Sequence, residues 1–108
     1  MNIKESLARN RAITKFVKKA KELLSDELID VLIYGSVVRG EAKPESDIDV
    51  IVIVKREVFK SQMKLASLAF DVLMDTGEYI SVQAVKPEDL NRDTIFMRNV
   101  REEAIHVV

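Results

Sequence analysis

The run from Ile48 to Val54 constrains the fold of this chain more than any other segment. Its sequence, IDVIVIV, is β-branched at every position but one, and apolar residues occupy both of its alternating faces. This pattern is typical of a central strand that is covered on both sides of a sheet. The chain has 108 residues, of which 47% are apolar. We therefore expect one domain, residues 1–108, with a core built around this strand.

Amphipathic helices are predicted where apolar residues recur every three or four positions. These segments are residues 3–24, residues 57–75 and a final helix over about residues 93–105. In the second helix, the residues expected to face inward are Val58, Phe59, Met63, Ala66, Phe70 and Leu73. Gly77 follows this helix and is expected to end it, because glycine readily adopts the left-handed conformation of a C-cap.

Two more strands are predicted, residues 29–34 before Gly35 and residues 79–85 before Pro87. Residues 40–46 form a loop in this prediction, and residues 87–90 a short helical turn. The order is helix, strand, loop, strand, helix, strand, helix. It predicts an α+β fold in which helices cover one face of a small mixed sheet. The other face, or an open edge, is then left for a ligand or a partner.

Two aspartates stand at the start of the central strand. Asp47 and Asp49 are two residues apart, so their side chains project to the same face. Asp49 is expected to be partly buried, and a buried charge needs a cation or hydrogen-bond donors. Carboxylate oxygens suit Mg²⁺ that carries a nucleotide triphosphate. The structural alternative is that Asp47 caps the loop and Asp49 pairs with Arg39.

The segment Gly35-Ser36 follows the first strand and predicts a phosphate-binding turn. Glycine lets the backbone approach a phosphate closely, and backbone N–H groups beside a Ser hydroxyl form an anion site. The alternative is a turn that only ends the strand. Arg39 has a guanidinium that could contact phosphate. We favour a structural ion pair of Arg39 with Glu41 or Glu45.

Composition excludes several classes of protein. The net charge of −1 leaves no basic excess, which argues against a protein that coats nucleic acid. Cysteine is absent, so disulfides and thiolate metal sites are excluded. No apolar run is long enough for a signal sequence or a membrane span, so we expect a cytoplasmic protein.

Two other features have ordinary interpretations. The lysines of the first helix, Lys15, Lys18, Lys19 and Lys21, are predicted to form a solvated face. Contact of that face with an acidic acceptor or RNA is the alternative. His106 is the single histidine and is expected at the surface rather than in a catalytic role.

The combination of these motifs resembles the signature of the DNA polymerase β-like nucleotidyltransferase superfamily. The motifs are Gly35-Ser36, Arg39-Gly40 and the run from Ser46 to Val52. They are most similar to the minimal nucleotidyltransferases. The resemblance implies transfer of a nucleoside monophosphate, AMP from ATP, assisted by two Mg²⁺ ions that three carboxylates hold. It assigns the triphosphate to Gly35 and Ser36, and Arg39 is a candidate for a further contact because of its guanidinium. It assigns the metals and catalysis to Asp47 and Asp49.

The third carboxylate of that family comes from a later strand, where this sequence departs from the pattern. Aligning residues 85–90 with the end of the pattern puts Gln83 at the third position. A glutamine carbonyl coordinates Mg²⁺ weakly and cannot act as a base. Glu78 could substitute if its loop folds inward. This departure bears on catalysis more than on nucleotide binding.

The resemblance also implies a partner, because minimal nucleotidyltransferases are often paired with a small helical HEPN protein. Some pairs act as antitoxin and toxin, and the nucleotidyltransferase modifies a tyrosine of its partner. Apolar residues on the open sheet face or the terminal helices would favour a homo-oligomer or a heteromer. Two alternatives remain. One is a nucleotide-binding module that neutralises a partner without catalysis. The other is a transferase for a small molecule such as an aminoglycoside.

Overall fold

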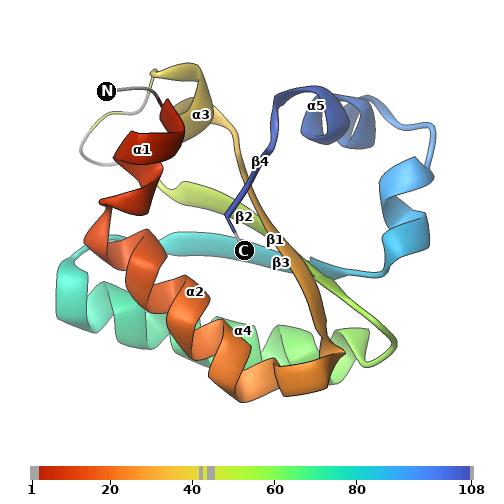
Figure 1. The fold of residues 1–108 in the computed structure, drawn as a ribbon, viewed down its shortest axis with the longest axis horizontal. Coiled ribbons are helices and arrows are strands. Elements are labelled where there is room, and N and C mark those ends of the chain that lie inside the picture. The colour runs from red at the N-terminus through yellow and green to blue at the C-terminus, as the bar shows by residue number, and fades with distance from the viewer. Residues whose placement is uncertain (1–2, 42, 44–45, 108) are drawn as a thin grey trace.

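The computed structural model describes residues 3–41, 43 and 46–107. Its helical segments are α1 (Ile3–Ala8), α2 (Arg11–Leu24), η1 (Ser25–Glu27), α3 (Ser36–Arg39), α4 (Val58–Thr76), η2 (Pro87–Asn91) and α5 (Ile95–Glu103). Its strands are β1 (Leu28–Tyr34), β2 (Ile48–Val54), β3 (Ile80–Val85) and β4 (Ile105–His106). Figure 1 shows the helices arranged around one twisted sheet. None of the helices in the described part of the chain is long and apolar enough to cross a membrane.

The sheet is mixed, with the strand order β3-β2-β1-β4. β2 pairs antiparallel with β1 and parallel with β3, and β4 pairs antiparallel with β1. Six of the seven β2 residues are buried, and only Asp49 is partly exposed. The prediction of a small mixed sheet around this strand is therefore confirmed.

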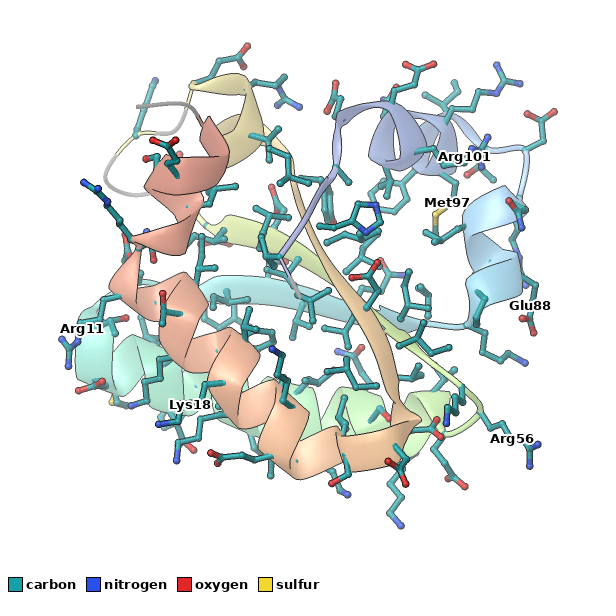
Figure 2. The ribbon with its side chains drawn as sticks, in the orientation of Figure 1. Arg11, Lys18, Arg56, Glu88, Met97 and Arg101 are labelled. Atoms are coloured by element: carbon teal, nitrogen blue, oxygen red, sulfur yellow. The ribbon has the colours of Figure 1, made fainter. Side chains whose placement is uncertain are left out.

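Two apolar cores lie on opposite faces of the sheet. α2 and α4 cover one face (Figure 1), where Phe16 and Leu65 pack with Val50 and Val52 of β2. The opposite face carries a smaller core that includes Ile51 and Ile53 of β2, with Met97 and Val100 of α5. Figure 2 shows Met97 between α5 and η2. The long helices thus occupy one face as predicted, and α5 closes only part of the other.

Two predicted helices differ in extent from those observed. The first is interrupted after α1, because the Asn10 side chain accepts a hydrogen bond from the Ile13 N–H at 2.9 Å and caps a new helix. The last ends at Glu103. Ile105 and His106, where we expected the end of a helix and a surface histidine, pair with Ile33 and Leu32 of β1. His106 is exposed, as predicted, and its Nδ1 lies 2.5 Å from Asp30 Oδ2.

The predicted inward face of α4 is wrong at four of its six positions, whereas Val58 and Leu73 are partly buried and Val58 packs against the larger core. Phe59, Met63 and Phe70 are 79%, 59% and 56% exposed, and Ala66 is exposed as well. The side chains that are buried are Ser61, Leu65, Leu68, Ala69 and Val72. α4 has apolar residues on two sides, and periodicity alone cannot decide which side meets the sheet. The predicted end at Gly77 is confirmed, because Gly77 has φ +79° and donates its N–H to Leu73 O.

Candidate active site

Gly35 joins β1 to α3 and lies directly against Asp49. Its φ is +81° and its ψ is −153°, a backbone region that is essentially open to glycine alone. A Cβ on Gly35 would overlap Asp49 Oδ2 and would lie 3.1 Å from Asp49 Cγ. Glycine is therefore required both for the backbone conformation and for the space that the carboxylate occupies.

The turn after Gly35 leads directly into the short helix α3. The N–H groups of Val38 and Arg39 donate to Gly35 O at 3.1 and 3.2 Å, and Glu41 N donates to Ser36 O at 2.9 Å. The N–H groups of Ser36 and Val37 precede these bonds, at the helix start, where N–H groups have no acceptor within the helix. Ser36 is half-buried. These features suit the phosphate-binding role predicted for Gly35-Ser36.

Asp49 lies on the sheet face that α2 and α4 do not cover. In β2 it alternates with residues of the larger core, and it shares its side with Ile51 and Ile53 of the smaller core. Across the strands it pairs with Tyr34 of β1 and Ser81 of β3. Asp47 directly precedes β2 and is exposed. The site therefore opens on the face that α5 and η2 cover only in part.

The electrostatic environment of Asp49 calls for a cation. Burial raises the pKa of Asp49, the charge of Asp47 raises it further, and Arg39 lowers it. Burial and the charge of Asp49 also raise the pKa of Tyr34. Within the described residues, neither Asp47 nor Asp49 belongs to an ion pair. Two adjacent carboxylates in such a setting are stabilised by a bound cation.

Arg39 makes structural ion pairs. Its Nε lies 3.3 Å from Glu41 Oε2, and one of its terminal nitrogens lies 3.1 Å from Glu103 Oε2. The predicted pairing with Glu41 is confirmed, and Glu45 lies outside the described residues. The bond to Glu103 ties α3 to α5, which the sequence did not indicate. A phosphate contact of Arg39 stays a prediction.

The third-ligand position on β3 is occupied by uncharged residues. Ser81 lies beside Asp49, whereas Gln83 is exposed and lies beside Ile51, two residues further along. Glu78 is exposed before β3, and its N–H bonds to Thr76 Oγ1 at 3.2 Å. In the described part of the chain, no three His, Cys, Asp or Glu side chains gather as a metal site. The sequence did not identify Ser81 as the neighbour of Asp49, because the register between two strands cannot be derived from a single sequence.

Comparison with known proteins decides the family. Residues 13–104 match the family described as the nucleotidyltransferase domain. The chain belongs to this family. Two Methanocaldococcus jannaschii relatives are named as inferred protein adenylyltransferases. The first is 31% identical over 90 residues, covering 80% of this chain and 60% of the relative. The second is 35% identical over 69 residues, covering 57% of this chain and 70% of the relative. The domain thus spans about 60% of the first relative's length.

Solved structures share the fold of this nucleotidyltransferase domain. A Sulfolobus solfataricus protein, described as an inferred nucleotidyltransferase, has a TM-score of 0.60 at 20% identity, covering 94% of this chain and 82% of its own. A toxin–antitoxin structure with AMP-PNP has a TM-score of 0.59 at 15% identity, covering 84% and 68%. An inferred minimal nucleotidyltransferase has a TM-score of 0.53 at 23% identity, covering 97% and 95%. Because these sequence identities are low, the similarity to the three solved structures shows a shared fold alone.

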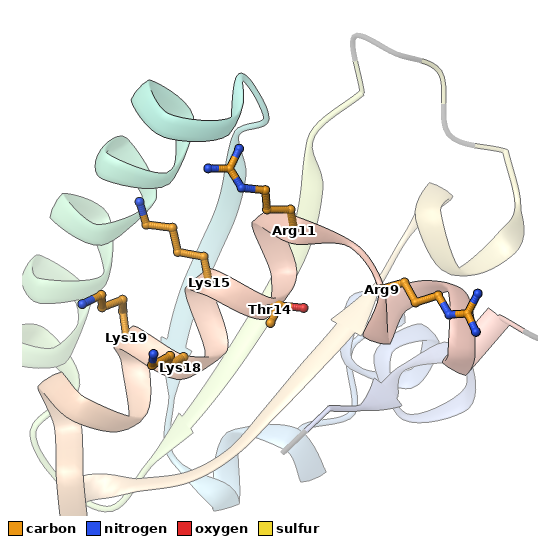
Figure 3. A pocket seen from close by; sticks show the side chains of 6 residues that line it. All are labelled: Arg9, Arg11, Thr14, Lys15, Lys18 and Lys19. Atoms are coloured by element: carbon orange, nitrogen blue, oxygen red, sulfur yellow. The ribbon is translucent and has the colours of Figure 1, made fainter.

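A separate basic hollow lies on α2 of this nucleotidyltransferase domain. Its volume is about 430 Å³, and its lining residues are Arg9, Arg11, Thr14, Lys15, Lys18 and Lys19 (Figure 3). Arg11 and Lys15 pair with Asp75 of α4 at 3.0 and 2.9 Å. Lys19 lies 3.6 Å from Glu22. Half of the predicted lysine face is therefore engaged in ion pairs on the protein itself.

Magnesium is expected to raise the melting temperature of the wild-type nucleotidyltransferase domain and to have little effect on Asp49→Asn. In metal-free buffer at pH 7, Asp49→Asn should melt above wild type. Folding raises the pKa of Asp49, so its contribution to stability is complete below the unfolded pKa and is lost as pH rises through the folded value. Circular dichroism melts in EDTA and in Mg²⁺ measure both effects.

Asp75→Asn is the matched control for this experiment. Lys15 and Arg11 hold the pKa of Asp75 below its usual range, so its stabilising contribution is present at pH 7 and is lost as pH falls through the folded value. Asp75→Asn should therefore lower the melting temperature at pH 7 and keep the magnesium response. A magnesium response that survives in Asp49→Asn would remove Asp49 from the metal site.

Proposed function

We propose that this chain is a magnesium-dependent nucleotidyltransferase that transfers AMP from ATP to an acceptor on a protein. The observation that carries the proposal is the contact of Gly35 with the Asp49 carboxylate, which joins the phosphate turn to the metal ligands. The names of the Methanocaldococcus relatives support AMP and a protein acceptor. The likeness to a toxin–antitoxin structure with AMP-PNP supports an adenine nucleotide and a partner.

Each group of the site has a defined task in this proposal. The backbone N–H groups at the start of α3 and the Ser36 hydroxyl hold the triphosphate, and Arg39 adds positive charge. Asp47 and Asp49 hold magnesium, and two ions suit an in-line displacement at the α-phosphate. Bound magnesium would supply charge neutralisation at the attacking and leaving oxygens. Asp49, with its raised pKa, is the group whose ionised form the metal stabilises.

The acceptor in this proposal is a tyrosine of a small helical HEPN protein, with this chain acting as the antitoxin. Asp47 is exposed just before the start of the interior strand β2, so an acceptor hydroxyl from another protein can reach it. A third carboxylate is not gathered with Asp47 and Asp49 in the described residues. In this proposal the partner protein therefore also supplies the third metal ligand, or the base that removes the proton of the acceptor hydroxyl.

Label transfer from α-³²P-ATP tests the proposal. A lysate of the native host receives Mg²⁺, labelled ATP and either wild type or the Asp47→Asn plus Asp49→Asn double variant. We expect a labelled protein band with wild type and none with the double variant. That band should be absent with γ-³²P-ATP, because its label leaves with pyrophosphate, and bands that kinases of the lysate produce are the same with wild type and the double variant. An α-labelled band that is equal with both proteins, or a γ-labelled band that requires wild type, would contradict AMP transfer by this site.

A second candidate function is a nucleotide-binding module that neutralises its partner by contact. The uncharged Ser81 and Gln83 on β3 favour it. The double aspartate variant separates the two functions, because a contact module keeps its affinity and its effect on the partner when transfer chemistry is removed. Pull-down of the partner and relief of its toxicity in cells measure these properties.

Ser81→Asp is expected to raise the rate of label transfer about tenfold, because metal affinity rises with the number of charged ligands. Gln83→Asp should have a smaller effect. Ser81 is the register neighbour of Asp49, and Gln83 lies about 6–7 Å further along the strand. Both variants are compared at limiting Mg²⁺. A larger gain from Gln83→Asp would restore Gln83 as the third position that the sequence alignment indicates.

A further inference from the structure

α4 carries an exposed apolar stripe that the proposed nucleotide site does not use. We define the α4 stripe as Phe59, Met63, Ala66, Phe70 and Met74. Its four large members are 79%, 59%, 56% and 67% exposed in that order. From Phe59 to Phe70 the spacing alternates four, three and four residues, which is the seam of a helix that packs against another helix. The stripe spans about 22 Å along the helix axis.

Contacts on both flanks of α4 fix the direction in which the stripe points. On one flank, Asp75 pairs with Arg11 and Lys15 of α2. On the other, the Gln62 side chain donates to Val82 O at 3.1 Å and accepts from Ala84 N at 2.7 Å, both on the edge strand β3. The inward side of α4 is buried in the larger core. The α4 stripe is exposed to solvent on the side of the helix opposite the buried residues Leu65, Leu68 and Val72.

The exposed area is large for a protein of this size. At 150–250 Å² for a whole aromatic side chain, Phe59 and Phe70 alone leave on the order of 250 Å² uncovered. With the two methionines, the α4 stripe reaches the size of patches that mark interaction sites on small proteins.

The charges beside the stripe indicate which kind of molecule binds it, namely a second copy of this chain. Lys60 and Lys64 lie in the amino-terminal half of α4, and Asp71 and Asp75 in the carboxy-terminal half. Residues 60 and 71 are eleven positions apart, which is three helical turns, so they share one row along the helix. A second α4 running antiparallel would place each Lys60 beside Asp71 of the other copy. In a parallel arrangement this row would lie against the opposite flank of the second helix, so Lys60 and Asp71 of the two copies would not meet.

We propose that the α4 stripe is the interface of a homodimer in which α4 packs antiparallel against α4 of a second copy. The small Ala66 lies at the centre of the stripe, where two helices can cross closely. Phe59 then meets Met74 of the second copy, and Met63 meets Phe70, which gives four favourable sulfur–aromatic contacts by symmetry. Asp49 lies on the opposite face of the sheet, so both nucleotide sites stay open.

Sedimentation velocity of the full chain over the micromolar range tests this proposal. We expect wild type to dimerise and Phe59→Glu to raise the dimer dissociation constant about a hundredfold, because a charge replaces the most exposed apolar side chain of the stripe. Ile95→Glu is the matched control: Ile95 is 77% exposed, close to the 79% of Phe59, and also lies in the first turn of its helix, α5. It should dimerise as wild type does.

A charge exchange tests the antiparallel arrangement itself. Lys60→Glu and Asp71→Lys should each weaken the dimer, and the two together should restore it, because both symmetric pairs are then reversed and complementary. Circular dichroism establishes that each variant is folded. A monomeric wild type, equal disruption by Ile95→Glu, or failure of the double exchange to restore the dimer would overturn the proposal. Association only with a foreign helical protein would assign the α4 stripe to that partner instead.

Discussion

Asp49→Asn is expected to lower the rate of AMP transfer by about three to four orders of magnitude without unfolding the protein. A metal ion at the reacting phosphate supplies several kcal/mol of transition-state stabilisation, and each 1.36 kcal/mol is a factor of ten in rate. Asparagine keeps the size of the side chain but removes the charge that holds the metal. The rate is measured by label transfer at saturating ATP and Mg²⁺.

Asp93→Asn is the control for this loss of activity. Asp93 is exposed and pairs with Arg98 of α5, 2.6 Å away, so its charge serves no part of the proposed site. Its variant should transfer AMP at the wild-type rate. If Asp49→Asn were as active as this control, the carboxylate beside Gly35 would not hold the catalytic metal. The contact-module function would then be the better explanation of the chain.

The strand pattern of the sequence predicts the centre of this fold well. A β-branched segment with two apolar faces has few places in a small domain other than the middle of a sheet, and β2 lies there. The two aspartates are predictable for a related reason, since a carboxylate in such a strand needs a specific partner. Local chemistry therefore identifies the strand and its candidate metal ligands.

Features that depend on the relation between elements could not be predicted. The register of β2 and β3 makes Ser81 rather than Gln83 the neighbour of Asp49. The two apolar sides of α4 have similar periodicity, and the packing against α2 and the sheet selects the side of Leu65. Ile105 and His106 form a strand because β1 offers them an edge. In each case a distant segment decides the outcome.

Gly35→Ala is expected to cost about 2–6 kcal/mol of folding stability, the largest effect we predict for a single methyl group in this chain. An L-residue with φ +81° and ψ −153° is strained by about 1–3 kcal/mol. The added Cβ also overlaps the Asp49 carboxylate, and overpacking of this kind costs about 1–3 kcal/mol more. Urea unfolding with a constant m-value measures the loss.

Gly40→Ala separates the cost of backbone strain from the cost of the overlap with Asp49. Gly40 has φ +75° and ψ +19°, and a Cβ there meets nothing within 4 Å. Its variant should lose only about 1 kcal/mol, from backbone strain alone. Adding Asp49→Ala to Gly35→Ala should recover part of the loss, because residues in contact couple by about 0.5–3 kcal/mol. Equal losses for both glycine variants, with no recovery in the double variant, would mean that Gly35 is not held against the Asp49 carboxylate. The proposed active site depends on that contact.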